Sequence, residues 1–131
     1  MVDSLTYQSF YLKVFETLPN FKNLKVFEDW KEDINEGYVA TMVLSDIARE
    51  MMKSVERGDE NVCDLLLTLI ENTLKNHPNS KVAAFIGTDF LVTILEYPMT
   101  KELKEKIKNK MGKETMLGYK IAKRGYNEIF K

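Results

Sequence analysis

Apolar residues recur at intervals of three and four residues along almost the whole of this 131-residue chain. Such spacing places side chains on one face of an α-helix. The clearest example comprises Tyr7, Phe10, Tyr11, Val14, Phe15 and Leu18. Ser4 is suited to begin this helix and Pro19 to end it. Because the sequence has no long apolar–polar alternation, no Asn-Gly hairpin turn and no βαβ rhythm, we expect few strands or none.

Short breaks separate the other helices that the spacing predicts. The predicted segments are residues 21–34, 38–57, 59–76, 80–86, 88–97, 101–111 and 116–130. Asp59, Ser80 and Thr100 are the predicted N-caps of three of these helices. Gly58 is predicted to end one helix in the left-handed conformation, and Gly87 to separate two others.

Length and composition fit a single domain that spans residues 1–131, since 44% hydrophobic residues suffice for one core without disulfides. We expect the apolar region 62–95 to form that core. The predicted fold is all-α, an irregular bundle of roughly six to eight helices. A short HEAT-like or armadillo-like array of antiparallel helix pairs is the alternative, because the short breaks also suit stacked pairs.

Charge is divided unevenly along the chain, although the formal net charge is only −1. Residues 1–98 carry 16 acidic and 9 basic side chains, a net charge of −7, while residues 99–131 carry 4 acidic and 10 basic side chains, a net charge of +6. The acidic side chains are densest around Trp30. We call the five carboxylates there the acidic cluster: Glu28, Asp29, Glu32, Asp33 and Glu36. Such a cluster suits a cationic partner.

The acidic cluster has two interpretations. Glu28 and Glu32 lie four residues apart, so one continuous helix would stack their like charges at a cost of about 0.3 kcal/mol. In the first interpretation the cluster is a solvated helix face and Trp30 is a partly buried core residue. In the second it binds a partner protein, with Phe27, Trp30 and Tyr38 as aromatic anchors and the carboxylates steering the encounter.

No catalytic or metal-binding constellation stands out, so we expect no enzymatic activity, no metal and no cofactor. Cys63 and His77 are the only residues of their kinds and lie far from any third candidate, which argues against a zinc site or a Cys–His nucleophile pair. We expect Cys63 to be a buried, unreactive thiol and His77 to serve as a cap or surface residue at a helix end. The acidic cluster also lacks the glycine and the aspartate spacing of a calcium loop.

The C-terminal segment is basic. Its cations include Lys101, Lys104, Lys108, Lys110, Lys120, Lys123 and Arg124. With Tyr119 and Tyr126 as stacking platforms they could bind RNA, but a pI near 5.9 and the acidic body oppose this. A solvated helix face is therefore preferred. No run of about 20 apolar residues and no secretion signal occurs, so we expect a cytoplasmic protein with no membrane contact.

Two apolar segments resemble a family of small, uncharacterised bacterial helical proteins. They are residues 62–74 (VCDLLLTLIENTL) and 81–95 (KVAAFIGTDFLVTIL). In the family, a helix that ends in an Ile-Glu-x-x-Leu-like turn precedes a Phe-Leu-Glu-x-Leu-like turn, and residues 110–113 resemble its Leu-Gly-Pro helix break. The resemblance spans about residues 62–119. Here Val92 stands in place of the family's usual glutamate, and Lys113 in place of the proline.

The family includes immunity proteins of bacterial toxin systems, among them contact-dependent growth inhibition. The resemblance implies a non-catalytic protein that binds and neutralises a cognate toxin domain, and it assigns no functional residue. A nuclease is the expected toxin, because nucleases are basic where they grip phosphates and an acidic protein can cover that surface. A helical-repeat adaptor that binds a peptide or helix on a concave surface is the alternative.

Overall fold

The computed structural model describes residues 4–129, and every regular element in that part of the chain is helical. The α-helices are α1 (Tyr7–Thr17), α2 (Lys25–Asp29), α3 (Gly37–Glu56), α4 (Glu60–Asn76), α5 (Lys81–Phe85), α6 (Leu91–Glu96), α7 (Lys101–Asn109) and α8 (Lys113–Ile129). Two 3₁₀ turns, Pro19–Asn23 and Lys31–Asp33, lie on either side of α2, and a π-turn, Ile86–Phe90, joins α5 to α6. The all-α prediction is confirmed.

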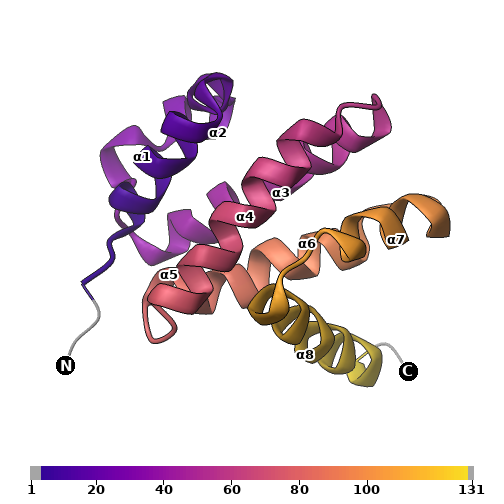
Figure 1. The fold of residues 1–131 in the computed structure, drawn as a ribbon. Helices are drawn as coiled ribbons and strands as arrows, with labels where there is room; N and C mark the ends of the chain where they lie inside the picture. Colours follow the sequence, from indigo (N-terminus) through magenta and orange to yellow (C-terminus); the bar gives the residue numbers. More distant parts are fainter. Residues whose placement is uncertain (1–3, 130–131) are drawn as a thin grey trace.

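Helix α3 lies at the centre of the bundle and packs against α4, α5, α6 and α2 (Figure 1). Its buried apolar side chains are Val39, Ala40, Val43, Leu44, Ile47, Ala48, Met51, Met52 and Val55. Residues from all the other helices join them in one hydrophobic core. Residues 62–95 belong to this core as predicted, through buried side chains of α4, α5 and α6. The core extends beyond them to α1 and α3, because apolar spacing identifies the buried face of each helix but not which helix the others surround.

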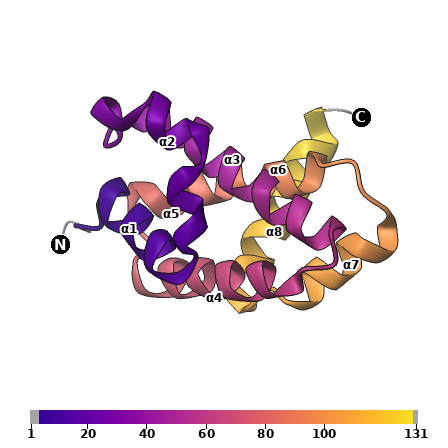
Figure 2. The ribbon, with the colours of Figure 1, turned by 90° about the horizontal axis from the view of Figure 1, so that it is seen from above.

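The bundle is irregular. Helix lengths range from 5 residues in α2 and α5 to 20 residues in α3, whereas a repeat array stacks units of similar length. Helices α1 and α2 lie at one end of the bundle and α7 at the other, as both views show (Figures 1 and 2). None of the helices within residues 4–129 is long and apolar enough to cross a membrane.

Three predicted N-caps are confirmed. The side chain of Asp59 accepts a hydrogen bond from the Asn61 amide at 3.2 Å, that of Ser80 from the Ala83 amide at 3.0 Å, and that of Thr100 from the Leu103 amide at 3.2 Å. Each bond satisfies a backbone donor that the first turn of a helix leaves unpaired. The first helix begins two residues later than predicted, since Thr6 and not Ser4 caps α1.

Two predicted helix boundaries are wrong. Residues 21–34 do not form one helix, because Pro19 opens a separate 3₁₀ turn and the short α2 ends at Asp29. Gly87 does not separate two helices either. The chain runs from α5 into α6 without leaving the helical conformation, and the wider π-turn accommodates the change in register between them.

The predicted left-handed cap at Gly58 is confirmed by a φ of 84°. Its amide donates to the Val55 carbonyl at 3.0 Å, which closes the C-terminus of α3. A side chain is disfavoured at this φ. We therefore expect Gly58→Ala to lower the free energy of unfolding by about 1 kcal/mol, measured by urea denaturation. Replacing the exposed neighbour Arg57 with alanine is the control, and an equal loss in both variants would contradict the conformational explanation.

Candidate protein-binding surface

Helix α2 and the 3₁₀ turn after it place four carboxylates of the acidic cluster on the surface, and Glu36 follows at the N-cap position of α3. Each of the five is exposed. Glu28 pairs with Lys31 at 3.4 Å, but both side chains are largely in solvent, so the pair contributes little stability. Within residues 4–129 no ion pair is formed by Glu32, Asp33 or Glu36. The acidic cluster therefore keeps most of its negative charge available to a partner.

The break in the helix at Trp30 changes how these charges are arranged. Trp30 ends α2 with φ −120° and ψ 19°, and the chain continues as a 3₁₀ turn. Glu28 and Glu32 consequently do not share one α-helix, and their like charges are not stacked at the i,i+4 distance that the sequence analysis considered. The acidic side chains therefore lie on α2, on the 3₁₀ turn after it and at the start of α3, and do not form one face of a single helix.

The three predicted aromatic anchors have different environments. Tyr38 is 58% exposed, and Trp30 is half-buried with its ring 6.1 Å from that of Tyr38 in an edge-to-face arrangement. Phe27 is only 8% exposed and packs edge-to-face against Tyr11 and Phe15. The prediction of Phe27 as a partner anchor is therefore wrong, because its ring belongs to the core. Trp30 and Tyr38 keep that assignment.

Tyr38 lies in the electrostatic field of the acidic cluster. Desolvation raises the pKa of Tyr38, and the neighbouring negative charges of Asp33 and Glu36 raise it further. Both carboxylates disfavour a phenolate beside them. Tyr38 is therefore a neutral, exposed aromatic ring with a polar hydroxyl at the edge of the acidic cluster, a type of side chain that is common at protein interfaces.

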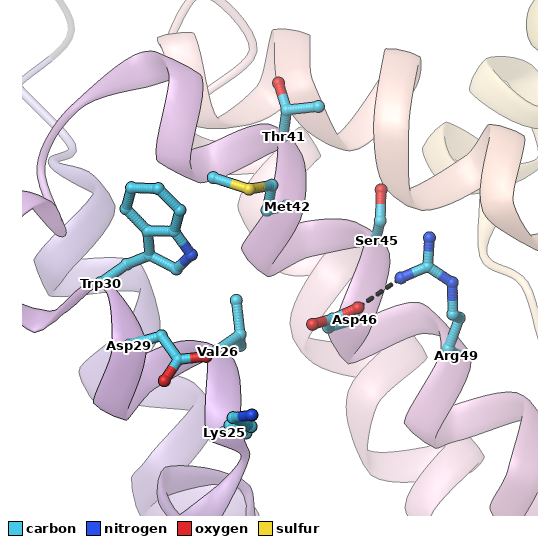
Figure 3. Close-up of a pocket in the computed structure, with 9 residues that line it drawn as sticks. All are labelled: Lys25, Val26, Asp29, Trp30, Thr41, Met42, Ser45, Asp46 and Arg49. Atoms are coloured by element: carbon cyan, nitrogen blue, oxygen red, sulfur yellow. Dashed lines mark hydrogen bonds and ion pairs between the residues drawn. The ribbon is translucent and has the colours of Figure 1, made fainter.

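A pocket of about 380 Å³ opens beside Trp30, between α2 and α3 (Figure 3). We call it the Trp30 pocket. Its lining consists of Lys25, Val26, Asp29, Trp30, Thr41, Met42, Ser45, Asp46 and Arg49. Trp30 and Met42 face each other across it, and an ion pair between Asp46 and Arg49 lies on the α3 side. The pocket thus combines apolar side chains with carboxylates and cations from both helices.

Sequence analysis identified the α2 side of this pocket and missed the α3 side. A signal was present, because Met42, Ser45, Asp46 and Arg49 follow one another at helical spacing. They form a mixed polar stripe beside the buried face of α3. The sequence alone does not distinguish such a stripe from ordinary solvated surface, because the position of α2 against it is not known from the sequence.

The basic end of the chain is partly neutralised by the acidic body. Lys110 bonds to Asp64 at 2.5 Å and lies 3.6 Å from Glu60, both on α4. Lys104 donates to the Leu95 carbonyl at 2.5 Å. Fewer of the C-terminal cations are therefore available than the sequence suggests. In both views α2 lies well apart from α7 and α8, so the acidic cluster and the basic end are separate surfaces (Figures 1 and 2).

The structure opposes the stacking role that the RNA-binding alternative gives to Tyr119. Tyr119 is 4% exposed, and the Lys108 ammonium lies 5.8 Å from its ring centroid. Burial raises the pKa of its hydroxyl, with Lys108 opposing that shift. A base cannot stack on a ring that the fold covers, so the basic end lacks one of the two aromatic platforms that the RNA-binding alternative requires.

Cys63 and His77 lie where the sequence analysis placed them. Cys63 is fully buried, and burial raises the pKa of its thiol to about 12, which keeps it in the unreactive protonated form at neutral pH. His77 is the C-cap residue of α4, and its amide donates to the Thr73 carbonyl at 2.8 Å. Within residues 4–129 no three His, Cys, Asp or Glu side chains are grouped closely enough to hold a metal ion.

Comparisons of the chain with protein-family models, with curated proteins and with solved structures give no significant match. The resemblance to the immunity-protein family therefore stays a prediction. Any assignment of function has to come from the surfaces described above, and the acidic cluster combines largely unpaired negative charge with the adjoining rings of Trp30 and Tyr38.

Proposed function

We propose that this protein is a non-catalytic immunity protein that binds and neutralises a cognate bacterial toxin domain of the nuclease class (RNase or tRNase). One observation carries the proposal: five exposed carboxylates surround Trp30 and Tyr38 and adjoin the Trp30 pocket. Exposed charges at the rim of an interface speed the association of two proteins. Aromatic side chains at its centre supply much of the binding energy.

Inhibition follows from the charge of the target. A nuclease binds its substrate through lysine and arginine side chains placed against phosphates. The carboxylates of the acidic cluster would attract that surface over several ångströms and then occupy it, which excludes the nucleic acid by charge and by volume. No chemistry is required of the immunity protein in this mechanism.

The Trp30 pocket would receive a basic side chain of the toxin. An arginine or lysine that enters it would lie along the Trp30 ring, with the Asp29 carboxylate at the same wall. A cation beside an indole ring contributes about 1 kcal/mol, and the aliphatic part of the side chain would contact Met42. Lys25 and Arg49 also line the pocket, so its own charge does not select a cation, and the basic partner class follows from the acidic cluster beside it.

The test is a binding measurement with the candidate toxin encoded next to this chain's gene. We expect the double variant Glu32→Lys/Asp33→Lys to associate at least about tenfold more slowly than the wild type at low ionic strength. The difference should shrink as salt is added, because salt screens exposed charges. Stopped-flow fluorescence of Trp30 reports the association rate, and residual nuclease activity reports protection.

The control is Glu102→Lys/Glu105→Lys, which makes the same change in net charge on α7, away from the acidic cluster. Its association rate should stay within about twofold of the wild type. Equal slowing in both variants would reject this surface as the interface. Full nuclease activity in the presence of excess wild-type protein would reject the proposed function itself.

A further inference from the structure

An apolar groove runs along α8, on a surface that shares no residue with the Trp30 pocket. Two adjoining pockets of about 540 and 450 Å³ form it, with α8 on one side and the segment from α5 to α6 on the other. The residues common to both pockets are Ala83, Ala84, Gly87, Gly118 and Ile121. We call the combined hollow the α8 groove.

Large apolar side chains border the α8 groove without being covered. Leu117 is 55% exposed, Ile121 is 60% exposed and Ile129 is 77% exposed. Their spacing of four and eight residues places them along one face of α8. A monomeric protein seldom leaves such a contiguous apolar strip in water, so the strip indicates a surface that binds something.

The glycines of the groove also indicate a binding surface. A methyl group on Gly118 would lie 2.9 Å from Leu91, so the contact between α8 and α6 explains that glycine. A methyl group on Gly125 or Gly87 would meet nothing within 4 Å. Glycine inside a helix costs about 1 kcal/mol relative to alanine, and the fold itself does not need it at these two positions. Their absent side chains leave room for an occupant from outside.

The charged residues that line the groove itself are two carboxylates, Glu114 at the start of α8 and Glu96 of α6. The solvent side of α8 beside the apolar strip is basic. Lys113, Lys120 and Arg124 are exposed and lie three or four residues from Leu117 and Ile121, along the solvent side of α8. Within residues 4–129 none of the three forms an ion pair. An occupant that contacts the apolar strip would bring its own flank against these cations, which favours acidic side chains there.

We propose that the α8 groove is a docking site for an amphipathic α-helix of a partner protein, with an apolar stripe in the groove and acidic residues on the flank that faces α8. The groove extends along α8 from Glu114 to Ile129, about 24 Å, which matches an occupant of four to five turns. Its small central residues allow a helix backbone to approach closely. A concave surface of this kind suits a helix better than a flat membrane.

The test uses the full chain and a fluorescein-labelled synthetic peptide of about 18 residues, helical and with leucines at i, i+3, i+4 and i+7. Glutamates occupy one flank of the peptide, the flank that would face the cations of α8, and a matched peptide carries lysines in their place. Fluorescence anisotropy should give at least about tenfold tighter binding of the acidic peptide. Binding of neither peptide, or equal binding of both, would overturn the proposal.

Variants then locate the binding site. Gly125→Leu places a side chain in the empty part of the groove and should weaken binding of the acidic peptide about tenfold or more, with an unchanged or higher melting temperature. Asn127→Leu adds the same side chain elsewhere on α8 and should leave the affinity within about twofold. In the same way Arg124→Glu should weaken binding more than Lys123→Glu, because Arg124 lies three residues from Ile121 and beside the apolar strip, whereas Lys123 lies two residues from Ile121 and faces another side of α8.

Two other ligands of the α8 groove, a second copy of this chain and a lipid surface, would give different experimental results. Self-association in analytical ultracentrifugation that Gly125→Leu abolishes would assign the groove to a second copy of this chain and overturn the proposal. Sedimentation with phosphatidylserine-containing vesicles that Gly125→Leu leaves intact but Ile129→Glu abolishes would assign the strip to a lipid surface and likewise overturn it. Because the acidic cluster is unchanged in all these variants, the toxin-binding test is independent of the result.

Discussion

Replacing Phe27 with alanine is expected to lower the free energy of unfolding by about 3 kcal/mol. The ring of Phe27 is 8% exposed, and its centroid lies 5.4 Å from that of Tyr11 and 4.7 Å from that of Phe15. Removal of the ring takes away both edge-to-face contacts and leaves a cavity between α1 and α2. Chemical denaturation followed by circular dichroism at 222 nm measures the loss.

Tyr38→Ala is the matched control, since it removes an aromatic ring of the same predicted set. Tyr38 is mostly in solvent, so its loss should change the free energy of unfolding by no more than about 0.5 kcal/mol. For binding to the proposed toxin the order of the two effects reverses. Tyr38→Ala should lower the affinity of the folded protein, because it removes an exposed anchor. A loss of stability below about 1 kcal/mol for Phe27→Ala would show that its ring is not part of the core.

The sequence predicted the helices well where local signals and packing agree. Asp59, Ser80 and Thr100 each precede an apolar stripe, and each caps the helix that it was expected to begin. A capping bond joins residues two or three positions apart, so sequence contains all that is needed to foresee it. The same holds for Gly58, where the left-handed conformation follows from the end of one stripe and the start of another.

The region of the candidate interface was harder to predict. Residues 21–34 have apolar side chains at helical spacing, and these residues do bury Phe21 and Phe27. A 3₁₀ turn can bury such residues as well as an α-helix can, so the pattern does not distinguish the two. The opening by Pro19, the weak helix propensity of Asn20 and Asn23, and repulsion within the acidic cluster all work against one long helix.

The acidic cluster itself could be located from the sequence, whereas the Trp30 pocket could not. Carboxylates close together in the chain are close together in space. The pocket instead depends on the approach of α2 to Met42 and Arg49 of α3, which a short α2 and its flanking turns determine. The α8 groove depends in the same way on how α8 lies against Gly87, some thirty residues earlier in the chain.

The second large effect is expected at the start of α8, where a carboxylate from another helix acts as the cap. Gly112 precedes α8 and has no side chain to offer. Glu71 of α4 accepts hydrogen bonds from the Glu114 amide at 3.1 Å, the Thr115 amide at 2.8 Å and the Thr115 hydroxyl at 2.9 Å. Its negative charge also complements the helix N-terminus. We expect Glu71→Ala to lower the free energy of unfolding by about 2 kcal/mol.

This cap makes stability depend on pH. Desolvation opposes the shift, but the hydrogen bonds from Thr115 and Glu114 and the charge of Lys75 hold the pKa of Glu71 below its ordinary value. The stabilisation is therefore complete above the unfolded-state pKa of about 4.3 and is lost as the pH falls through the lower pKa of the folded state. Glu71→Gln should lack this contribution, so its difference from wild type in unfolding free energy should shrink below about pH 4.

Gly112 is expected to be coupled to Glu71. A methyl group on Gly112 would lie 2.4 Å from Cδ and 2.5 Å from Cγ of Glu71, too close for the carboxylate to keep its place. Gly112→Ala should therefore displace Glu71 and cost about as much as Glu71→Ala, roughly 2 kcal/mol. Once Glu71 is an alanine, the clash is absent, and Gly112→Ala should cost only a few tenths of a kcal/mol.

A double-mutant cycle with urea denaturation shows whether Glu71→Ala and Gly112→Ala lower the free energy of unfolding through this one cap or by independent mechanisms. The double variant Glu71→Ala/Gly112→Ala should be about 2 kcal/mol less stable than wild type, close to either single variant. Additive losses of about 4 kcal/mol would mean that Gly112→Ala damages α8 in some other way and that Glu71 keeps its position. Because α8 also forms one side of the α8 groove, loss of the cap should loosen the groove while the acidic cluster on α2 keeps its geometry.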